Sequence, residues 1–122
     1  MGEGRGERTM GNSAQNDTDL DRTLAALADP HRRRAVELLG ARPRAAGELA
    51  RDLGLTPPAM SRHLKALRDS GLVEESHPAF DARVRIYALR AEPMGELKRW
   101  LEAAEALWSD QLAAFKRHVE GA

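Results

Sequence analysis

Between Leu55 and Leu72, hydrophobic residues recur every three or four positions, and the positions between them are mostly basic or polar. This spacing predicts an amphipathic helix whose apolar face consists of Met60, Leu64 and Leu67. The helix has recognisable ends: Thr56 suits the N-cap, Pro57 the first helical position, and Gly71 the left-handed residue that follows a helix. Its other sides offer hydroxyl and cationic donors from Ser61, Arg62, Lys65 and Arg68.

Three shorter helical patterns come before this one. Residues 17–28 place Leu20, Leu24 and Leu27 on one side and begin with acidic residues, which suit a helix N-terminus. A second helix starts at Asp29-Pro30 and turns residues 36, 38 and 39 inward before Gly40. A third covers residues 46–53, with residues 49, 50 and 53 buried, and stops at Gly54. The glycine-containing turn into the 55–72 helix predicts a helix-turn-helix.

Basic residues 31–34 open the second of these helices. They form either a solvated surface on which Arg32 makes a structural ion pair, or a direct phosphate contact. A charge run alone does not decide between the two.

Alternating residues predict a β-hairpin made of residues 72–76 and 84–89. Its connection, residues 77–83, contains a proline and an aspartate and is expected to project as a wing. Arg83 and Arg85 either reach phosphate or the minor groove, or are solvated strand arginines. Phe80 is expected to lie buried beneath the wing. Residues 43–45 fit a small β-bridge.

The last helical pattern, residues 93–119, carries two apolar stripes. One contains Leu97, Leu101, Ala104, Trp108, Leu112, Phe115 and Val119, and the other contains Trp100, Leu107 and Ala114. One stripe can cover the chain's own core, but two leave apolar surface without an intrachain partner. A second subunit is the economical explanation, and packing explains the aromatic residues better than a ligand cage does.

Length and composition favour one small domain, since the chain has 122 residues of which 42% are hydrophobic. Residues 1–16 are nearly devoid of apolar side chains and are expected to be a disordered tail; Met10 is an alternative start to Met1. There is no cysteine, which excludes disulfides and thiolate ligands. No apolar run suggests a membrane span or signal peptide, so a cytoplasmic protein is expected.

The net charge is zero, but the charges are unevenly distributed. Residues 31–90 carry twelve basic and seven acidic side chains, whereas acidic residues predominate before and after them. A basic middle segment is the local footprint of a DNA-binding protein. The candidate DNA-binding residues are Thr56, Pro58, Ala59, Ser61, Arg62, His63, Lys65, Arg68, Arg83 and Arg85.

The candidate residues divide by chemistry. Ser61 and Arg62, with the small apolar groups of Pro58 and Ala59, suit base edges in the major groove, because arginine pairs with guanine and apolar groups meet the thymine methyl. The remaining cations suit phosphates. His63 instead bridges to a backbone group in an alternative interpretation.

The order of elements, together with residues 25–39, 46–55 and 58–73, resembles the ArsR-type winged-helix transcriptional repressors of bacteria. The resemblance covers about residues 17–119. It implies a mainly α fold with a small β-hairpin (α+β), a winged helix-turn-helix over residues 17–122 with a C-terminal dimerisation helix at about 93–119. It also implies a homodimer that binds double-stranded DNA at an inverted repeat near its own promoter. The expected dimer interface is Leu20, Leu24, Leu97, Trp100, Leu101, Ala104, Leu107, Trp108 and Phe115.

The chain departs from the metal-sensing members of that family. The helix before the turn lacks the cysteine motif, and the last helix offers Asp110 and His118 without the paired ligands that other sensors use. The chain looks like the branch without a metal site, so no metal and no cofactor are expected, and an effector is unknown.

Two other classes of function compete with DNA binding. A winged-helix protein-interaction module would use the long last helix to dock a partner. An enzyme is disfavoured, because the sequence has no glycine-rich phosphate loop, nucleophile elbow or His-Glu metal motif, and its four histidines are scattered.

Overall fold

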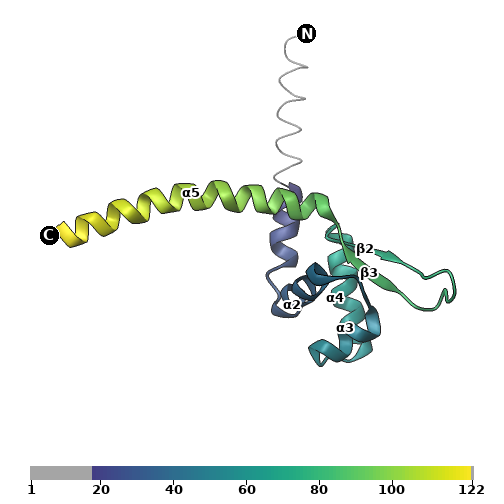
Figure 1. The fold of residues 1–122 in the computed structure, drawn as a ribbon. Helices are drawn as coiled ribbons and strands as arrows, with labels where there is room; N and C mark the ends of the chain where they lie inside the picture. The colour runs from purple at the N-terminus through teal and green to yellow at the C-terminus, as the bar shows by residue number, and fades with distance from the viewer. Residues whose placement is uncertain (1–17, 122) are drawn as a thin grey trace, which may run out of the picture.

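The structure, a computed structural model, describes residues 18–121, so the predicted tail at residues 1–16 lies outside the described part. Helical residues 18–26 are followed by α2 (Pro30–Ala41), β1 (Arg44–Ala45), α3 (Ala46–Leu53), α4 (Pro57–Asp69), β2 (Val73–Ser76), β3 (Ile86–Leu89) and α5 (Ala91–Gly121). Helices α2, α3 and α4 gather beside the sheet, whereas α5 runs far out from them (Figure 1). The mainly helical winged-helix architecture is confirmed.

Local signals in the sequence set most helix ends. Asp29 caps α2, and its carboxylate accepts the backbone N–H groups of His31 at 2.8 Å and Arg32 at 3.2 Å. Thr56 caps α4 by accepting the N–H of Ala59 at 3.3 Å. Gly54 follows α3 with φ +66°, and Gly71 follows α4 with φ +81°, the left-handed conformation that glycine adopts without steric cost.

The end of α2 differs from the prediction. The helix continues through Gly40 to Ala41 and ends at Arg42, whose backbone is extended. Arg42 precedes Pro43, and a residue before proline is forced out of the helical region by the proline ring. The proline, rather than the glycine, therefore ends this helix.

The sheet has three antiparallel strands in the order β1-β3-β2. Tyr87 of the central strand lies opposite Arg44 on one side and Glu75 on the other. The third strand is shorter than predicted, because it begins at Ile86 rather than residue 84. Tyr87 is buried, so the face of the strand that carries it turns toward the core.

One hydrophobic core lies between α2, α3, α4 and the sheet. The predicted apolar face of α4 is confirmed, since Met60, Leu64 and Leu67 are each 1% exposed or less. The other buried apolar residues are Ala26, Ala35, Leu39, Leu49, Ala50, Leu72, Val73 and Tyr87. The face of α4 opposite these residues remains available to solvent.

The basic run at the start of α2 is largely structural. Arg32 Nε donates to the carbonyl of Ala26 at 2.6 Å, and Arg33 Nη1 donates to those of Leu27 and Ala28 at 2.9 and 3.0 Å. These carbonyls end the first helix and have no intrahelical donors. The two arginines therefore join this helix to α2. Arg32 also makes the predicted structural ion pair, since its Nη1 lies 4.0 Å from Asp29 Oδ2.

The expectation that Phe80 lies beneath the wing is wrong, because its side chain is 90% exposed. The loop between β2 and β3, residues 77–85, closes on itself and does not fold back over the core. The N–H of Asp81 donates to the carbonyl of Pro78 at 3.2 Å, and that of Val84 donates to the carbonyl of Asp81 at 3.3 Å. Phe80 lies within the first of these turns.

Helix α5 begins one residue after β3. At this junction the N–H of Arg90 donates to the carbonyl of Leu72 at 2.9 Å. The helix spans 31 residues and buries none of them. Its exposed large apolar side chains are Trp100, Leu101, Leu107, Trp108, Leu112, Phe115 and Val119. Among residues 18–121, no helix combines the length and apolar character that crossing a bilayer requires.

Candidate DNA-binding site

The helix-turn-helix is built from α3 and α4. The turn between them is short, because the N–H of Gly54 donates to the carbonyl of Arg51 at 3.2 Å and that of Leu55 donates to Ala50 at 2.9 Å. These bonds close α3 and direct the chain into the Thr56 cap of α4. The packing of Leu49, Met60 and Leu64 in the core then fixes the angle between the two helices.

The N-terminal half of α4 offers the predicted base-reading groups to solvent. Thr56 and Pro58 are exposed, and Ala59 and Ser61 are partly exposed. Arg62 is exposed and makes no hydrogen bond or ion pair with any residue in the described part of the chain. Its guanidinium therefore has all five donors available, including the pair that can bind one guanine edge.

The predicted phosphate contacts on α4 are engaged within the fold. Lys65 Nζ lies 2.8 Å from Asp69 Oδ2, and the Arg68 guanidinium contacts the carboxylate of Glu75. The hydrogen bond from Lys65 lowers the pKa of Asp69 more than burial raises it. Lys65 remains largely exposed, at 68% of its side chain, whereas Arg68 is tied to β2.

His63 faces α2 rather than solvent. Its side chain is 18% exposed, and its Nδ1 lies 4.0 Å from Asp29 Oδ1. The His31 ring lies beside it, with the two ring centroids 5.5 Å apart. His63 thus contributes to the contact between α2 and α4.

The wing brings one of the predicted arginines, Arg85, to α4. Arg85 Nη2 lies 3.5 Å from Ser61 Oγ, a long contact that places the base of the wing beside the start of α4. Arg83 lies further along the loop with 92% of its side chain exposed, and its Nε lies 3.4 Å from Asp81 Oδ1. Ser61 contacts Arg85, and Arg83 lines one hollow with Arg85, so these three residues belong to one surface.

Arg51 is a member of this surface that sequence reasoning missed. It is exposed on α3 and, with Gly47, Arg83 and Arg85, lines a hollow of about 360 Å³ between α3 and the wing. The signal was present in the helical pattern, because Arg51 falls on the side of α3 away from Leu49. Three guanidinium groups around one hollow suit a phosphate of the DNA backbone.

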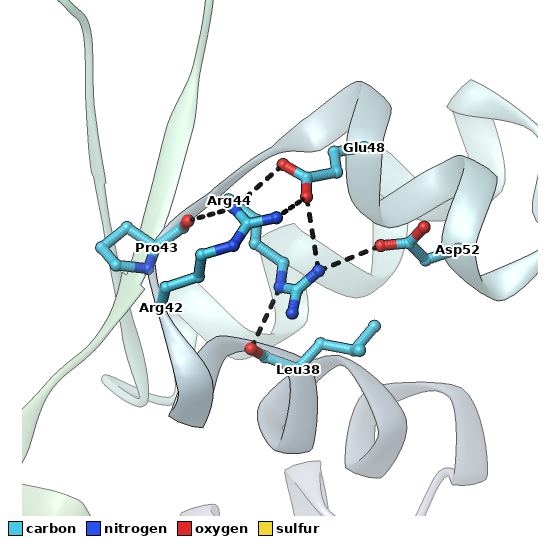
Figure 2. Close-up of polar contacts among 6 residues, drawn as sticks. All are labelled: Leu38, Arg42, Pro43, Arg44, Glu48 and Asp52. Atoms are coloured by element: carbon cyan, nitrogen blue, oxygen red, sulfur yellow. Dashed lines mark hydrogen bonds and ion pairs between the residues drawn. The ribbon is translucent and has the colours of Figure 1, made fainter.

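A charge network joins α3 to the segment that connects it with α2 (Figure 2). The Arg42 guanidinium contacts the carboxylate of Glu48, and Arg44 Nη1 lies 3.3 Å from Glu48 Oε2 and 3.2 Å from Asp52 Oδ2. Arg44 Nε also donates to the carbonyl of Leu38 at 3.1 Å, which joins α3 to the end of α2. Because the Arg42 hydrogen bond outweighs burial, the pKa of Glu48 is lowered. Glu48 lines the same hollow, and both arginines compensate its charge.

The predicted dimer residues lie on the first helix and α5. Leu20 and Leu97 are half-buried, whereas Leu24 is 38% exposed. Trp100 and Trp108 meet edge to face on α5, with ring centroids 6.4 Å apart and an interplanar angle of 85°. Within the described residues, no group of three carboxylate or imidazole side chains is close enough together to hold a metal ion.

A helix-turn-helix whose second helix and hairpin share one exposed cationic surface defines the winged-helix class of DNA-binding domains. Residues 27–76 match the model of a helix-turn-helix domain family. The chain is 39% identical over 100 residues to the HTH-type transcriptional regulator Rv2034 of Mycobacterium tuberculosis, covering 82% of this chain and 88% of that protein.

Solved structures agree. An ArsR-like transcriptional regulator from Rhodococcus sp. RHA1 is 32% identical, with a TM-score of 0.63 and coverage of 82% of this chain and 92% of that one. HlyU from Vibrio cholerae is 29% identical, with a TM-score of 0.60, and the match covers 77% of this chain and 96% of the HlyU chain. The chain belongs to the ArsR family of winged helix-turn-helix transcriptional regulators. It is a transcriptional regulator with a helix-turn-helix DNA-binding domain, and the prediction that it is not an enzyme is confirmed by this family.

Proposed function

We propose that the protein is a homodimeric transcriptional repressor that binds an inverted-repeat operator near its own promoter. The observation that carries this proposal is the apolar surface of α5, on which Trp108, Leu112 and Phe115 are 52%, 66% and 66% exposed. Apolar groups on this scale are stabilised by burial against a second copy. A twofold dimer presents two identical α4 helices, and such a pair matches a DNA site with twofold symmetry.

Each protomer uses its surface in two ways. Arg62 and Ser61, with Pro58 and Ala59, read base edges in the major groove. Arg51, Arg83 and Arg85 contact the phosphates of the DNA backbone. These contacts orient α4 on the duplex but carry no sequence information. Repression follows from occupation of the promoter, which excludes the polymerase.

The experiment is binding of the purified protein to the DNA upstream of its gene and to random DNA of equal length, each at several salt concentrations. The expected result is a protected site with two symmetric half-sites about 34–36 Å apart, together with a steep fall of the logarithm of affinity with the logarithm of salt. Sedimentation of the complex should give two chains per site. In a transcription assay with the same promoter, added protein should lower transcript yield.

Other outcomes reject specific parts of the proposal. Equal affinity for operator and random DNA at every salt concentration rejects sequence-specific binding. One chain per site rejects the dimer, and increased transcription rejects repression. A flat salt response with a captured protein partner favours an interaction module instead, in which α5 is the docking surface.

A further inference from the structure

Phe80 is the most exposed large apolar side chain in the described part of the molecule, at 90%. Neither the core nor the charge network uses it. Residues 79 and 82 beside it are exposed alanines, so no neighbouring apolar cluster shields the ring. An exposed phenyl ring gains free energy when a partner removes it from water.

The loop holds Phe80 in a defined position. The turn bond from the Asp81 N–H to the Pro78 carbonyl spans it, and the carboxylate of Asp81 accepts the N–H of Arg83 at 3.0 Å. At the base of the loop, His77 Nδ1 lies 3.0 Å from the carbonyl of Val84. Because the loop is already ordered by these bonds, a partner that contacts Phe80 incurs little further loss of conformational entropy.

The position of Phe80 separates it from the apolar surface of α5. The β2–β3 loop and the free end of α5 extend in opposite directions from the helical core (Figure 1). A second copy packed along α5 therefore leaves this loop uncovered. The loop instead joins the surface around Arg83 and Arg85, whose cations attract a polyanion.

We propose that Phe80 is an apolar wedge that enters the minor groove beside each half-site and partly unstacks one base step. The proposal rests on the proposed function, since it requires operator DNA. Arg83 and Arg85 hold the DNA backbone beside the wing while the phenyl ring enters between base pairs. Apolar side chains that enter a minor groove in this way kink the duplex toward the major groove.

This wedge adds sequence preference without base-edge hydrogen bonds. Pyrimidine–purine steps such as TA unstack at low cost, whereas A-tract steps are stiff. The operator is therefore selected at its flanks for a flexible step under the wing. The preference is separate from that of Arg62, which is proposed to read base edges in the major groove.

The test compares the full-length wild type with Phe80→Ala, Phe80→Leu and the neighbouring control Ala82→Ser. Affinity and end-to-end fluorescence transfer are measured on labelled operators that carry TA or AA at the flank. Phe80→Ala is expected to weaken binding to the TA operator about tenfold, reduce its bend and abolish the preference for TA over AA. The salt slope, which is the change in the logarithm of affinity with the logarithm of salt concentration, should stay unchanged, because no charge is removed. Phe80→Leu should retain most of the bend, and Ala82→Ser should match the wild type.

The outcomes separate this inference from the proposed function. A wild type that prefers its operator, with Phe80→Ala equal to it in affinity, bend and TA preference, overturns the wedge and leaves the regulator intact. A wild type that does not distinguish operator from random DNA overturns both. Thermal unfolding of each variant serves as a folding check, and an exposed phenyl ring should leave the melting temperature within the range of Ala82→Ser.

Discussion

The guanidinium of Arg68 contacts the carboxylate of Glu75, which joins the C-terminal half of α4 to β2. The same carboxylate accepts a hydrogen bond from the Tyr87 hydroxyl at 3.2 Å. Burial raises the pKa of Tyr87. The positive charge of Arg85 lowers this pKa and the negative charge of Glu75 raises it, and the net effect is an increase. Arg68 therefore serves the packing of α4 on the sheet.

Replacing Arg68 with alanine should lower stability by about 1 kcal/mol, a magnitude limited by solvent because the Arg68 side chain is 48% exposed. The salt dependence of DNA binding should change little, since the Arg68 guanidinium is held at Glu75 of β2, whose side chain is only 16% exposed. Lys65 differs, because it is 68% exposed and its partner Asp69 is 60% exposed, so that its ammonium group can exchange Asp69 for a phosphate. Denaturant unfolding of Arg68→Ala, Glu75→Gln and the double variant measures the coupling between the two side chains. Additive losses in this cycle would show that the contact contributes nothing.

Arg62→Ala should cost about 1–3 kcal/mol of operator binding and relax the preference at one base pair, because a bidentate arginine discriminates one base from another. Lys65→Ala is the matched comparison on the same helix. It should weaken operator and random DNA alike and reduce the salt slope by about 0.9. Competition with single-base operator variants measures both effects, and equal losses on all sequences for Arg62→Ala would contradict its role as a base reader.

Gly54→Ala should destabilise the fold by about 1 kcal/mol, because its φ of +66° is disfavoured for any residue with a β-carbon. Apart from the adjacent residues, no atom lies within 4 Å of the place that this β-carbon would occupy, so the cost comes from the backbone alone. Gly47→Ala is the control in the preceding helix, where alanine should stabilise by about 0.5–1 kcal/mol. Chemical denaturation of both variants checks the opposite signs.

Acid should weaken the fold through Asp29. Although burial raises the pKa of Asp29, hydrogen bonds from the Arg32 and His31 N–H groups and the charges of His63 and Arg32 lower it overall. A carboxyl whose pKa is lower in the folded chain stabilises the fold above its unfolded pKa and loses that contribution as the pH falls below about 4.

Asp29→Asn keeps a capping side chain but removes the charge. The stability difference between the wild type and Asp29→Asn should be constant above about pH 5 and shrink below about pH 4. Thermal unfolding across this range measures that difference. A difference that does not depend on pH would mean that Asp29 acts as a cap without a contribution from its charge.

Leu112→Glu should convert the dimer that we propose into monomers, because it introduces a charge at the centre of the apolar surface of α5. The wild type should show a melting temperature that rises with protein concentration, and Leu112→Glu should not. Glu105→Gln on the same helix is the control and should sediment as the wild type does. A wild type that sediments as one chain at all concentrations contradicts the assignment of this surface.

Much of the fold was predictable because its signals are local. The caps at Asp29 and Thr56 and the left-handed glycines act within a few residues of the helix ends that they set. Long-range contacts were not predictable in the same way. Arg68 was predicted to contact phosphate as a cation on the outer side of α4. No helical pattern could reveal its partner Glu75, because Glu75 lies on a strand. His63 likewise faces Asp29, a residue from a different part of the chain.

The exposure of Phe80 could not be predicted from its hydrophobicity. Hydrophobicity alone favoured burial, but the turn at residues 78–81 carries the ring away from the core. Hydrophobicity predicts burial only where the backbone can bring the residue to a core. Arg51 was overlooked for the opposite reason, because its role depends on a wing that approaches α3 from a distant part of the sequence.

A single residue, Arg90, separates the wing strand β3 from α5, so no longer linker connects the two elements. The Arg90 N–H donates to the Leu72 carbonyl at 2.9 Å, and the Arg90 guanidinium lies 3.5 Å from the carbonyl of Gly71, two residues after the end of α4. Because this one residue joins α5 to β3 and is hydrogen-bonded to the segment after α4, a tilt of α5 would move the wing and the C-terminal end of α4 together. In the homodimer that we propose, this junction would set the distance between the two α4 helices, and with it the spacing of the half-sites that they bind.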